Sequence, residues 1–226
     1  MVRKVFSLSK PFHLLIIDDG SPDGTAQKVK ALQVEFPDSL FLIERSGKQG
    51  LGTAYIAGFK WALQRHYQFV FEMDCDFSHN PDDLLRLYKA CAENGNDLAI
   101  GSRYVNGGGF VNWPQDRIWI SRIASWYANI ITWICIRDTT AGFICYKRTV
   151  LETIDLDKIR FVGYAFQIEM KFAARKLGFK IVEIPIIFTE RVEGVSKMSK
   201  NIIKEGILGV LKIQWYSFFN SYRKQN

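Results

Sequence analysis

The sequence predicts an α/β protein with a mostly parallel sheet flanked by helices, and three observations lead to this class. Short β-rich runs alternate with segments of helical periodicity along the chain. The β-rich runs are continuous stretches of Leu, Ile, Val and Phe, which is typical of strands covered on both faces. Of the 226 residues 48% are hydrophobic and 23% are charged, so the composition indicates a folded chain with a sizeable core.

Six segments are candidate strands. They are His13–Asp19, Leu40–Glu44, Phe69–Asp74, Leu98–Ser102, Gly142–Tyr146 and Lys180–Phe188. Between them a helix is expected to start at Asn80 and Pro81, as N-cap and first-turn proline, and to close at Gly95. Its apolar face comprises Leu84, Leu87, Tyr88 and Cys91, and a similar helical repeat comprises Thr25, Val29, Leu32 and Phe36.

Two later segments are amphipathic. Trp119–Ile136 contains three tryptophans, and Ile202–Phe219 has a broad apolar face within a helix expected over residues 199–222. The basic residues around the second segment are Lys200, Lys204, Lys212, Arg223 and Lys224. Both segments can pack as ordinary helices on the sheet, or lie on a membrane surface with aromatic and basic side chains at the headgroups. The two interpretations are compatible if one face packs and the other meets lipid.

The composition also bears on partners. A net charge of +7 favours an anionic partner such as nucleic acid, an anionic membrane or a phosphorylated substrate. The four cysteines lie far apart without a Cys-x-x-Cys pair, which argues against a zinc site and against a disulfide framework. The first ten residues do not resemble a signal peptide, and no run of about 18 apolar residues predicts a spanning helix.

Acidic residues gather where two predicted strands end, and ligands bind at the carboxyl ends of strands in open α/β sheets. Asp74 and Asp76 follow an apolar strand and, at positions i and i+2, can reach one cation. Such hard oxygen ligands suit Mg²⁺ or Mn²⁺ shared with substrate phosphates. The alternative is that both aspartates only cap the next helix, with His79 orienting the loop.

Asp18 and Asp19 end the first predicted strand, ahead of Gly-Ser-Pro-Asp-Gly-Thr. They can belong to a turn with N-capping aspartates. Two carboxylates at the end of a buried strand are nevertheless costly unless a cationic or hydroxylated group meets them. The base amide or ribose hydroxyls of a nucleotide would serve.

Across nearly its whole length the chain resembles the dolichyl- or polyprenyl-phosphate mannosyltransferases, within family 2 of the inverting glycosyltransferases with the GT-A fold. The matching stretches are Ile17–Thr25, Gly50–Tyr55, Met73–His79, Gly101–Tyr104, Trp113–Pro114 with Arg117, Ile120–Arg122, Gly163–Met170 and Arg191–Lys197. The two aspartate motifs mark family 2 broadly. Gly-Ser-Arg-Tyr, Phe-Gln-Ile-Glu-Met and Arg…Gly-x-Ser-Lys are more particular to the lipid-phosphate branch.

The resemblance implies roles for the acidic residues. Asp18 and Asp19 would bind the nucleotide. Asp74 and Asp76 would hold a Mg²⁺ or Mn²⁺ ion and the donor diphosphate, with Ser78 as a possible third ligand.

It also implies roles for basic residues. Arg103 and Arg117 would grip the acceptor phosphate. Arg191, Ser196 and Lys197 would belong to a loop that closes over the donor diphosphate. Gln167 and Glu169 would face the acceptor side, on a helix that also shows an ordinary core face.

The function so implied is transfer of mannose from GDP-mannose to a polyprenyl phosphate, giving a β-linked product at the cytoplasmic face of the membrane, where the protein is peripheral. A phosphate acceptor is already ionised near neutral pH, so no general base is required. The alternatives are a UDP-glucose-dependent transferase and a non-catalytic binder of nucleotide or lipid phosphate. Nucleic acid is disfavoured, because acidic strand ends would repel its backbone.

The resemblance further implies that residues 1–226 form one glycosyltransferase domain without the family's first strand, with Val2–Leu8 as the tail of the helix that follows it. That strand lies inside the sheet of the family. Its absence would expose strand edges and favour self-association.

Overall fold

The computed structural model describes residues 1–163, 165–190 and 200–225, with the side chains of 200–205 excepted. The helices are α1 (Val2–Phe6), α2 (Thr25–Glu35), α3 (Leu51–Gln64), α4 (Asp83–Ala92), α5 (Gln115–Thr132), α6 (Arg148–Thr153), α7 (Ala165–Lys176) and α8 (Lys200–Phe219), with a short 3-10 helix at Leu156–Lys158. The strands are β1 (Leu14–Asp18), β2 (Leu40–Glu44), β3 (Phe69–Glu72), β4 (Leu98–Ser102), β5 (Gly109–Val111), β6 (Ile144–Lys147), β7 (Ile181–Pro185) and β8 (Ile187–Thr189).

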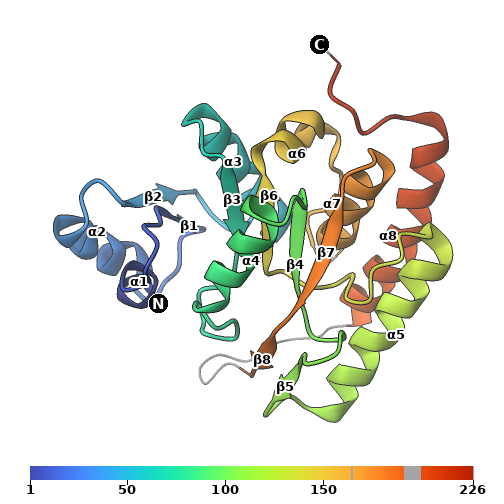
Figure 1. Cartoon of the computed structure of the whole chain (residues 1–226), viewed down its shortest axis with the longest axis horizontal. Helices are drawn as coiled ribbons and strands as arrows, with labels where there is room; N and C mark the ends of the chain where they lie inside the picture. The colour runs from blue at the N-terminus through green and yellow to red at the C-terminus, as the bar shows by residue number, and fades with distance from the viewer. Residues whose placement is uncertain (164, 191–199, 226) are drawn as a thin grey trace.

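The strands form three sheets, shown in Figure 1. The central sheet has the order β3-β6-β4-β7, while β1 pairs with β2 and β5 with β8. In the described part of the chain, the pairings β1-β2, β4-β7 and β5-β8 are parallel, and only the two that involve β6 are antiparallel. The α/β class with a mostly parallel arrangement and flanking helices is therefore confirmed.

Alternate residues of the central strands supply two cores, one on each face of the sheet. Leu98, Ile100 and Tyr146 belong to the larger core, which extends over α3, α5, α6, α7 and α8. Ala99 and Cys145 point to the smaller core, which is covered by α4 and by Val5 of α1. The strand β4 is buried throughout, as its continuous apolar sequence predicts.

Several predicted boundaries are wrong: β6 begins at Ile144 and not at Gly142, β3 ends at Glu72, and α4 ends at Ala92. Two further differences have a clear physical reason. The expected strand Lys180–Phe188 is broken at Ile186, because its N–H donates to Ser102 O while its carbonyl accepts from Gly109 N, and the chain thereby passes from β4 to β5. The helix expected from Pro81 begins at Asp83. The Asn80 side chain caps the preceding turn instead, accepting the Asp82 N–H at 3.1 Å.

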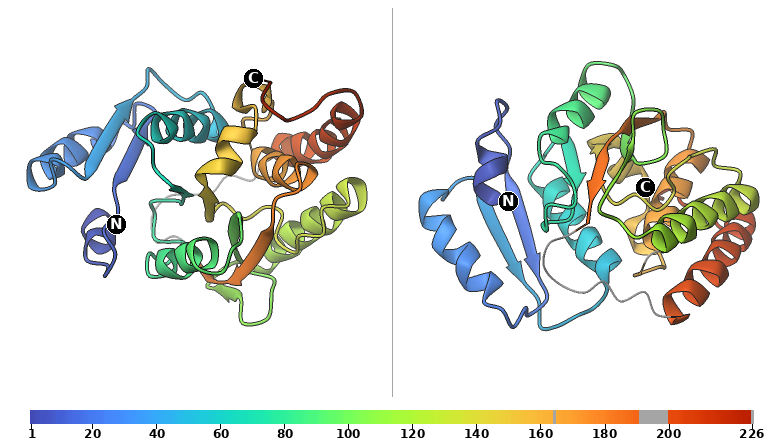
Figure 2. Two further views of the ribbon diagram at one scale, coloured as in Figure 1. Left: turned by 45° about the horizontal axis from the view of Figure 1, so that its top comes forward. Right: turned by 90° about the horizontal axis from the view of Figure 1, so that it is seen from below.

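The two-stranded sheet β1-β2 lies beside the central sheet without a hydrogen-bonded strand pairing to it among the described residues (Figure 2). The helix α3 contacts both β1 and β3 and so connects the two sheets. The rings of Phe12 and Phe71 also meet edge to face, with centroids 5.7 Å apart. The helix expected within Val2–Leu8 is present as α1.

The helices α5 and α8 pack side by side at the far edge of the molecule, where the Tyr127 hydroxyl donates to the carbonyl of Ile207 at 3.1 Å. Each helix buries one face and exposes another. Trp126 and Trp215, for example, are 67% and 68% exposed, whereas Ala128 and Ile213 are buried. Packing of one face on the rest of the protein is therefore confirmed, and the exposed apolar face is what the membrane interpretation requires. Among the residues that the structure describes, no helix is long and apolar enough to cross a membrane.

Candidate active site

A cavity of about 150 Å³ opens at the carboxyl ends of β3 and β4. Its lining brings together five of the predicted site residues, which are Asp74, Asp76, Ser78, Arg103 and Arg117. Acidic and basic side chains from distant parts of the sequence thus face one space. Asp18 and Asp19 do not line it, and the predicted residues Arg191, Ser196 and Lys197 lie outside the described residues.

The loop after β3 presents the acidic pair. The Asp76 carboxylate accepts both the N–H and the hydroxyl of Ser78, at 3.0 and 2.6 Å, while Phe77 between them adopts a left-handed φ of 62°. The Tyr55 hydroxyl of α3 lies 3.5 Å from a carboxylate oxygen of Asp74. Burial and the negative charge of Asp74 raise the pKa of Tyr55 well above its ordinary value, so it stays a neutral donor.

The donor set can be compared with the needs of a divalent cation. Mg²⁺ in proteins is commonly held by one or two carboxylates, with substrate phosphates and water completing an octahedron. Asp74 and Asp76 lie in the lining of one cavity, so they fit this pattern. No group of three or more His, Cys, Asp or Glu side chains among the described residues forms a closed metal site. The Ser78 hydroxyl is already engaged by Asp76, and its role as a third ligand stays a prediction.

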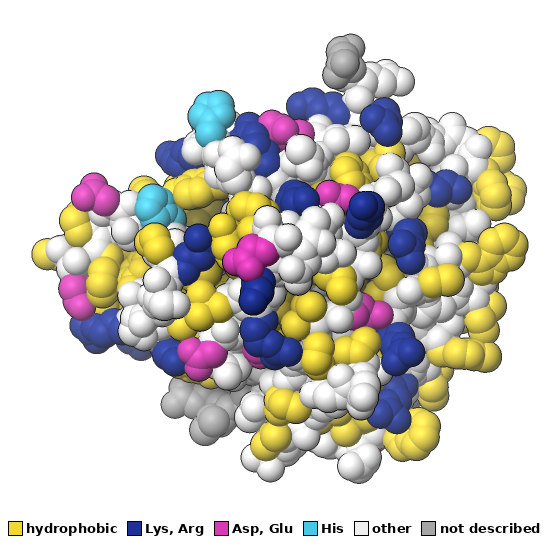
Figure 3. Space-filling view, viewed as in Figure 1, with side chains coloured by type: hydrophobic (Ala, Val, Ile, Leu, Met, Phe, Trp, Pro, Cys, Tyr) yellow, Lys and Arg dark blue, Asp and Glu magenta, His cyan; other side chains and the backbone are white. Residues whose placement is uncertain are grey.

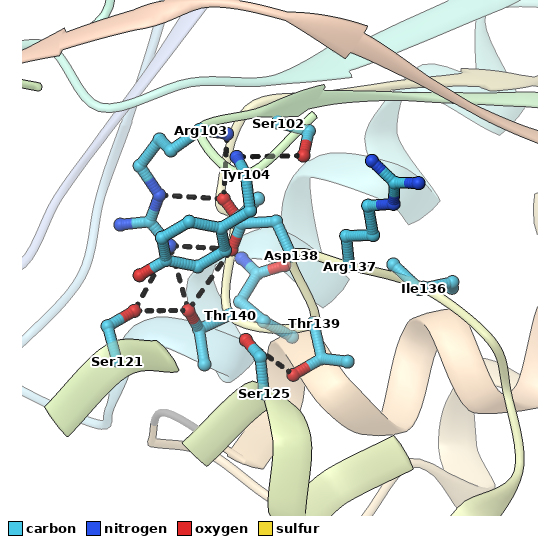
Figure 4. A network of polar contacts seen from close by, with 12 residues as sticks. Ser102, Arg103, Tyr104, Ser121, Ser125, Ile136, Arg137, Asp138, Thr139 and Thr140 are labelled. Atoms are coloured by element: carbon cyan, nitrogen blue, oxygen red, sulfur yellow. Dashed lines mark hydrogen bonds and ion pairs between the residues drawn. The ribbon is translucent and has the colours of Figure 1, made fainter. Parts of the chain in front are cut away.

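Arg103 follows β4 and is held by a buried ion pair (Figure 4). Its Nε and Nη2 donate to the two carboxylate oxygens of Asp138 at 2.7 and 2.6 Å, and Nη2 also donates to Thr140 at 2.8 Å. Burial opposes the charge of Arg103, but the Asp138 carboxylate outweighs it and raises the pKa of the guanidinium. The remaining nitrogen, Nη1, has no hydrogen bond to any described residue, so it is the donor available to a ligand.

Asp138 is itself positioned by Glu183 on β7. One carboxylate oxygen of Glu183 accepts the Asp138 N–H at 2.9 Å and the Ser102 hydroxyl at 2.7 Å. The other oxygen accepts the Arg137 N–H at 2.8 Å. A chain of carboxylate contacts therefore runs from β7 to Asp138 and fixes the direction of the Arg103 guanidinium.

Arg117 reaches the same cavity from the first turn of α5, which begins after Pro114. Its Nη1 donates to Glu190 at 3.0 Å, and both side chains keep about a fifth of their surface exposed (22% and 23%). An arginine held by a partly solvated carboxylate can change partner at small cost. The Arg117–Glu190 pair is the more exposed of the two arginine pairs at the cavity.

Asp18 and Asp19 lie at the end of β1. A carboxylate oxygen of Asp18 accepts the N–H groups of Gly20 and Ser21 at 3.2 and 3.1 Å, which shapes the turn. Asp19 receives a bidentate pair from Arg45, with both distances 2.6 Å, and this hydrogen bonding lowers the pKa of the carboxyl. Arg45 also donates to Thr53 of α3, so the pair ties β1 to the next helix.

The start of α3 packs closely on the loop before α7. The Gly52 N–H donates to the carbonyl of Val162 at 2.8 Å, and a Cβ at Gly52 would lie 2.7 Å from the carbonyl oxygen of Phe161. This loop is held in turn by Glu169 of α7, which accepts the N–H groups of Arg160 and Phe161 at 2.9 and 3.0 Å. Glycine is required at position 52 because no side chain fits there.

The helix α7 brings Gln167 to the cavity and carries a buried lysine. Lys171 is fully buried and donates to the carbonyls of Ala141 and Gln167 at 2.6 and 3.1 Å. Burial lowers its pKa to about 8. Glu72 on β3 is also buried, which raises its pKa to about 8, and it accepts the Tyr146 hydroxyl at 3.2 Å.

His79 lines the cavity between the rings of Phe143 and Phe188. Burial lowers its pKa to about 4, which makes the imidazole neutral and a weak base at physiological pH.

Sequence reasoning missed four residues that shape the cavity or its arginines, namely Asp138, Thr140, Glu183 and Glu190. Asp138 and Thr140 lie in a short polar run between an apolar helix and a buried strand, a position that could have marked them. Glu183 interrupts an apolar strand, and a charge there needs a partner. Glu190 offered no comparable signal.

Helices flank a central sheet in which β6 alone runs against its neighbours, and acidic residues and two arginines meet at the carboxyl ends of β3 and β4. This is the arrangement expected of a GT-A glycosyltransferase. Residues 1–155 match the model of the family described as glycosyl transferase family 2, and the chain belongs to this family. The family assignment made from the sequence is therefore confirmed, and the protein is a glycosyltransferase.

Two curated relatives are each 46% identical to the chain. Polyprenol monophosphomannose synthase of Mycolicibacterium smegmatis aligns over 210 residues, 93% of this chain and 79% of that protein. Undecaprenyl-phosphate mannosyltransferase of Micrococcus luteus aligns over 199 residues, 88% of this chain and 81% of that protein.

Solved structures support the fold alone. Glucosyl-3-phosphoglycerate synthase of Mycobacterium tuberculosis, in complex with phosphoglyceric acid, superposes with a TM-score of 0.66 at 14% identity, covering 90% of this chain and 69% of that one. Its complex with Mn²⁺, UDP-glucose and phosphoglyceric acid gives a TM-score of 0.65 at 15% identity, covering 89% and 68%.

Proposed function

We propose that this chain transfers mannose from GDP-mannose to a polyprenyl phosphate, with inversion to a β-linked product. The observation that carries the proposal is the cavity itself, whose lining contains both the carboxylates of Asp74 and Asp76 and the guanidinium groups of Arg103 and Arg117. A carboxylate pair suits a cation with a donor diphosphate, and an arginine pair suits an acceptor phosphate. The names of the two relatives that are 46% identical support mannose as the transferred sugar and a polyprenyl phosphate as the acceptor.

The acceptor phosphate needs orientation rather than deprotonation. The second pKa of a phosphate monoester is about 6, so one oxygen already carries charge near neutral pH. That oxygen attacks the anomeric carbon of the donor, and the bond from this carbon to the diphosphate breaks. Arg103 offers Nη1 from a fixed position and Arg117 adds a second guanidinium, so the two hold the attacking oxygen in line.

Asp74 and Asp76 would hold Mg²⁺ or Mn²⁺, which, when bound, offsets the charge that develops on the leaving diphosphate. Tyr55 supports this arrangement from α3 through its contact with Asp74. Asp18 and Asp19, whose turn is linked to the start of α3 through Arg45 and Thr53, would bind the nucleotide. Arg191, Ser196 and Lys197 would close over the donor diphosphate.

The exposed faces of α5 and α8 supply the surface that meets the membrane. Hydrophobic side chains gather along the edge of the molecule formed by these helices (Figure 3). The exposed set on α5 and its C-cap is Trp119, Ile123, Trp126, Ile130 and Trp133, and the set on α8 is Ile207, Leu208, Leu211, Trp215, Phe218 and Phe219. Aromatic and basic side chains on interfacial helices favour the headgroup region of an anionic membrane. Peripheral attachment there, on the cytoplasmic face, would bring the cavity to its lipid acceptor.

The proposal is tested by sugar transfer to polyprenyl phosphate in anionic vesicles. The purified chain is assayed with Mg²⁺ or Mn²⁺ and with GDP-mannose, GDP-glucose, UDP-glucose or UDP-mannose as donor. Mannose transfer from the guanine nucleotide that EDTA abolishes is the expected result. Transfer from UDP-glucose alone would move the assignment to glucosyl transfer, and nucleotide binding without turnover would favour a non-catalytic binder.

The same vesicles report on the membrane surface when they are pelleted. The wild-type chain should sediment with them, and W126A/W215A should remain in the supernatant. Equal sedimentation of both proteins would refute the role of α5 and α8. Size-exclusion chromatography without vesicles tests the proposed self-association through strand edges, which predicts a species larger than the 26.0 kDa monomer.

A further inference from the structure

Gln167 lines the cavity with an amide that is almost completely buried and has no hydrogen-bond partner. Its side chain belongs to the same lining as Asp74 and Asp76, and the residue is only 4% exposed. Neither Oε1 nor Nε2 forms a hydrogen bond with any described residue. Gly142 opposite has no side chain, and a Cβ built there would lie 3.5 Å from Nε2.

Such an amide is costly unless a ligand satisfies it. A buried polar group without a partner loses its hydration and gains nothing in return, and native structures contain few such groups. The helix turn that carries Gln167 is fixed, because the buried Lys171 donates to its main-chain carbonyl at 3.1 Å. Glu72 of β3 is a polar neighbour of the amide, and hydrogen bonding from the Gln167 side chain contributes to lowering the pKa of that carboxyl. The contact falls short of a well-formed hydrogen bond, and a buried oxygen of Glu72 is itself left without a partner, so Glu72 does not satisfy both ends of the amide.

The chemistry of the two unmatched atoms indicates the kind of ligand. An amide presents one acceptor and donors side by side. Ionised phosphate oxygens only accept hydrogen bonds, so they would leave Oε1 unmatched, and the cavity already has arginines for them. A hydroxyl both donates and accepts, and two neighbouring hydroxyls on a sugar ring match the two ends of the amide.

Building on the proposed donor, we propose that Gln167 recognises the transferred sugar, with Oε1 and Nε2 hydrogen-bonded to two vicinal ring hydroxyls. Gln167 is then a specificity-determining residue that touches the substrate. Because the site is complementary to a hydroxyl pair, a donor lacking either hydroxyl leaves one end of the buried amide unmatched and is discriminated against.

The test measures every combination of an enzyme variant and a donor analogue, so that the loss caused by the variant can be compared between donors. Transfer from GDP-mannose and from its 2-, 3- and 4-deoxy analogues is measured for the wild-type chain, Q167L and Q214L. Leucine has a similar size without the amide. Gln214 of α8 is the matched control, because its Oε1 is also buried and unpartnered but it does not line the cavity.

We expect the wild-type chain to lose about tenfold in kcat/KM for each deoxy donor that lacks one of the paired hydroxyls, the equivalent of one neutral hydrogen bond. The affected positions should be adjacent on the ring. In Q167L these ratios should fall to about twofold, while Q214L keeps the wild-type ratios. The melting temperature of Q167L should equal or exceed that of the wild type, since an unmatched buried amide has been removed.

Uniform slowing of Q167L with every donor, at unchanged ratios, would overturn the inference and make Gln167 a structural residue. A lower melting temperature with unchanged ratios would do the same. If Q167L does not fold, Q167N, which withdraws the amide by one methylene, takes its place with the same expected loss of discrimination. A wild-type chain that transfers sugar from no donor refutes the proposed function together with this inference, whereas transfer with unchanged ratios refutes this inference alone.

Discussion

Compared with the Arg103–Asp138 pair at the central sheet, the Arg45–Asp19 pair at the end of β1 is more exposed. Asp19 keeps 23% of its side chain exposed and is held by one arginine. Asp138, the partner of Arg103 beyond β4, is fully buried. Burial would raise the pKa of the Asp138 carboxyl, but the charge and hydrogen bonds of Arg103 hold it below the ordinary value. Glu183 adds a further carboxylate behind that pair.

The difference shows that the groups proposed for the acceptor phosphate and those proposed for the nucleotide are held in different ways. The groups proposed to meet the acceptor phosphate are preorganised, which favours the stabilisation of charge during the reaction. The groups proposed to meet the nucleotide belong to a turn that is attached to α3 through Arg45 and Thr53. Three substitutions measure this contrast, beginning with the most damaging.

The largest effect is expected for D138N in the central sheet. The amide cannot compensate the Arg103 charge, and breaking a buried ion pair from one side costs about 3–5 kcal/mol. We expect a loss of this size in the free energy of unfolding by urea, together with a lower affinity for polyprenyl phosphate. The matched control is E190Q, which removes the charge of one partner of Arg117, in the more exposed pair, and should cost about 1 kcal/mol or less. Equal losses for the two variants would contradict the contrast between the two arginines.

A smaller effect is expected for G52A, at the contact between α3 and the loop before α7. The new methyl group would approach the Phe161 carbonyl oxygen and the Phe166 ring, at 2.7 and 2.8 Å before any adjustment. Overpacking of this kind costs about 1–3 kcal/mol. Thermal or urea unfolding measures it. G206A is the control with opposite sign, because nothing lies within 4 Å of a Cβ at this helical glycine and alanine should stabilise α8 by about 0.5–1 kcal/mol.

The smallest effect is expected for R45K in the β1-β2 sheet. Lysine cannot reproduce the bidentate geometry, but the pair is partly solvated, so the free energy of unfolding should fall by about 1 kcal/mol. Because the folded-state pKa of Asp19 is lowered, the stabilisation is present above the ordinary pKa of 3.8 and is lost as pH falls through the folded value. Urea unfolding at pH 7 and pH 3 should therefore show the difference between R45K and wild type shrinking at pH 3.

The control for this pH dependence is K30A, which removes an ion pair to Glu44 whose side chains are 54% and 48% exposed. It should change the free energy of unfolding by less than about 0.5 kcal/mol at pH 7. A loss for R45K that is as large at pH 3 as at pH 7 would mean that lost packing, and not the Asp19 pair, causes it.

Much of the fold could be predicted, because continuous apolar runs such as Leu98–Ser102 can only be strands or helices buried on both faces, and their length decides between them. The break at Ile186 could not be predicted. It arises because Ile186 hydrogen-bonds to Ser102 at the end of β4 and to Gly109 at the start of β5, and both partners are far away in the sequence. The start of α4 was misplaced by two residues because Asn80 caps a turn as readily as a helix.

Some residues of the candidate site could be predicted from the sequence, and others are revealed only by the tertiary structure. Asp74, Asp76, Arg103 and Arg117 lie in motifs, and the structure places them around one cavity. The local sequence marks Asp138 and Glu183 as acidic residues that need a partner, but only the tertiary structure shows that Asp138 pairs with Arg103 and that Glu183 supports Asp138. The unmatched state of the Gln167 amide is a property of its three-dimensional surroundings and has no signature in the sequence.

The pairing of the strands has a consequence for how the chain acquires its structure. The sheet β1-β2 joins Leu14 to Leu40 across a single helix, whereas β4-β7 joins Leu98 to Ile181 and must wait until most of the chain is available. Local pairings form faster than distant ones, and chains fold from the N-terminus during synthesis. We therefore expect the nucleotide-side turn to form early on the ribosome, and the buried pair of Arg103 and Asp138 to form only once β7 brings Glu183 into place.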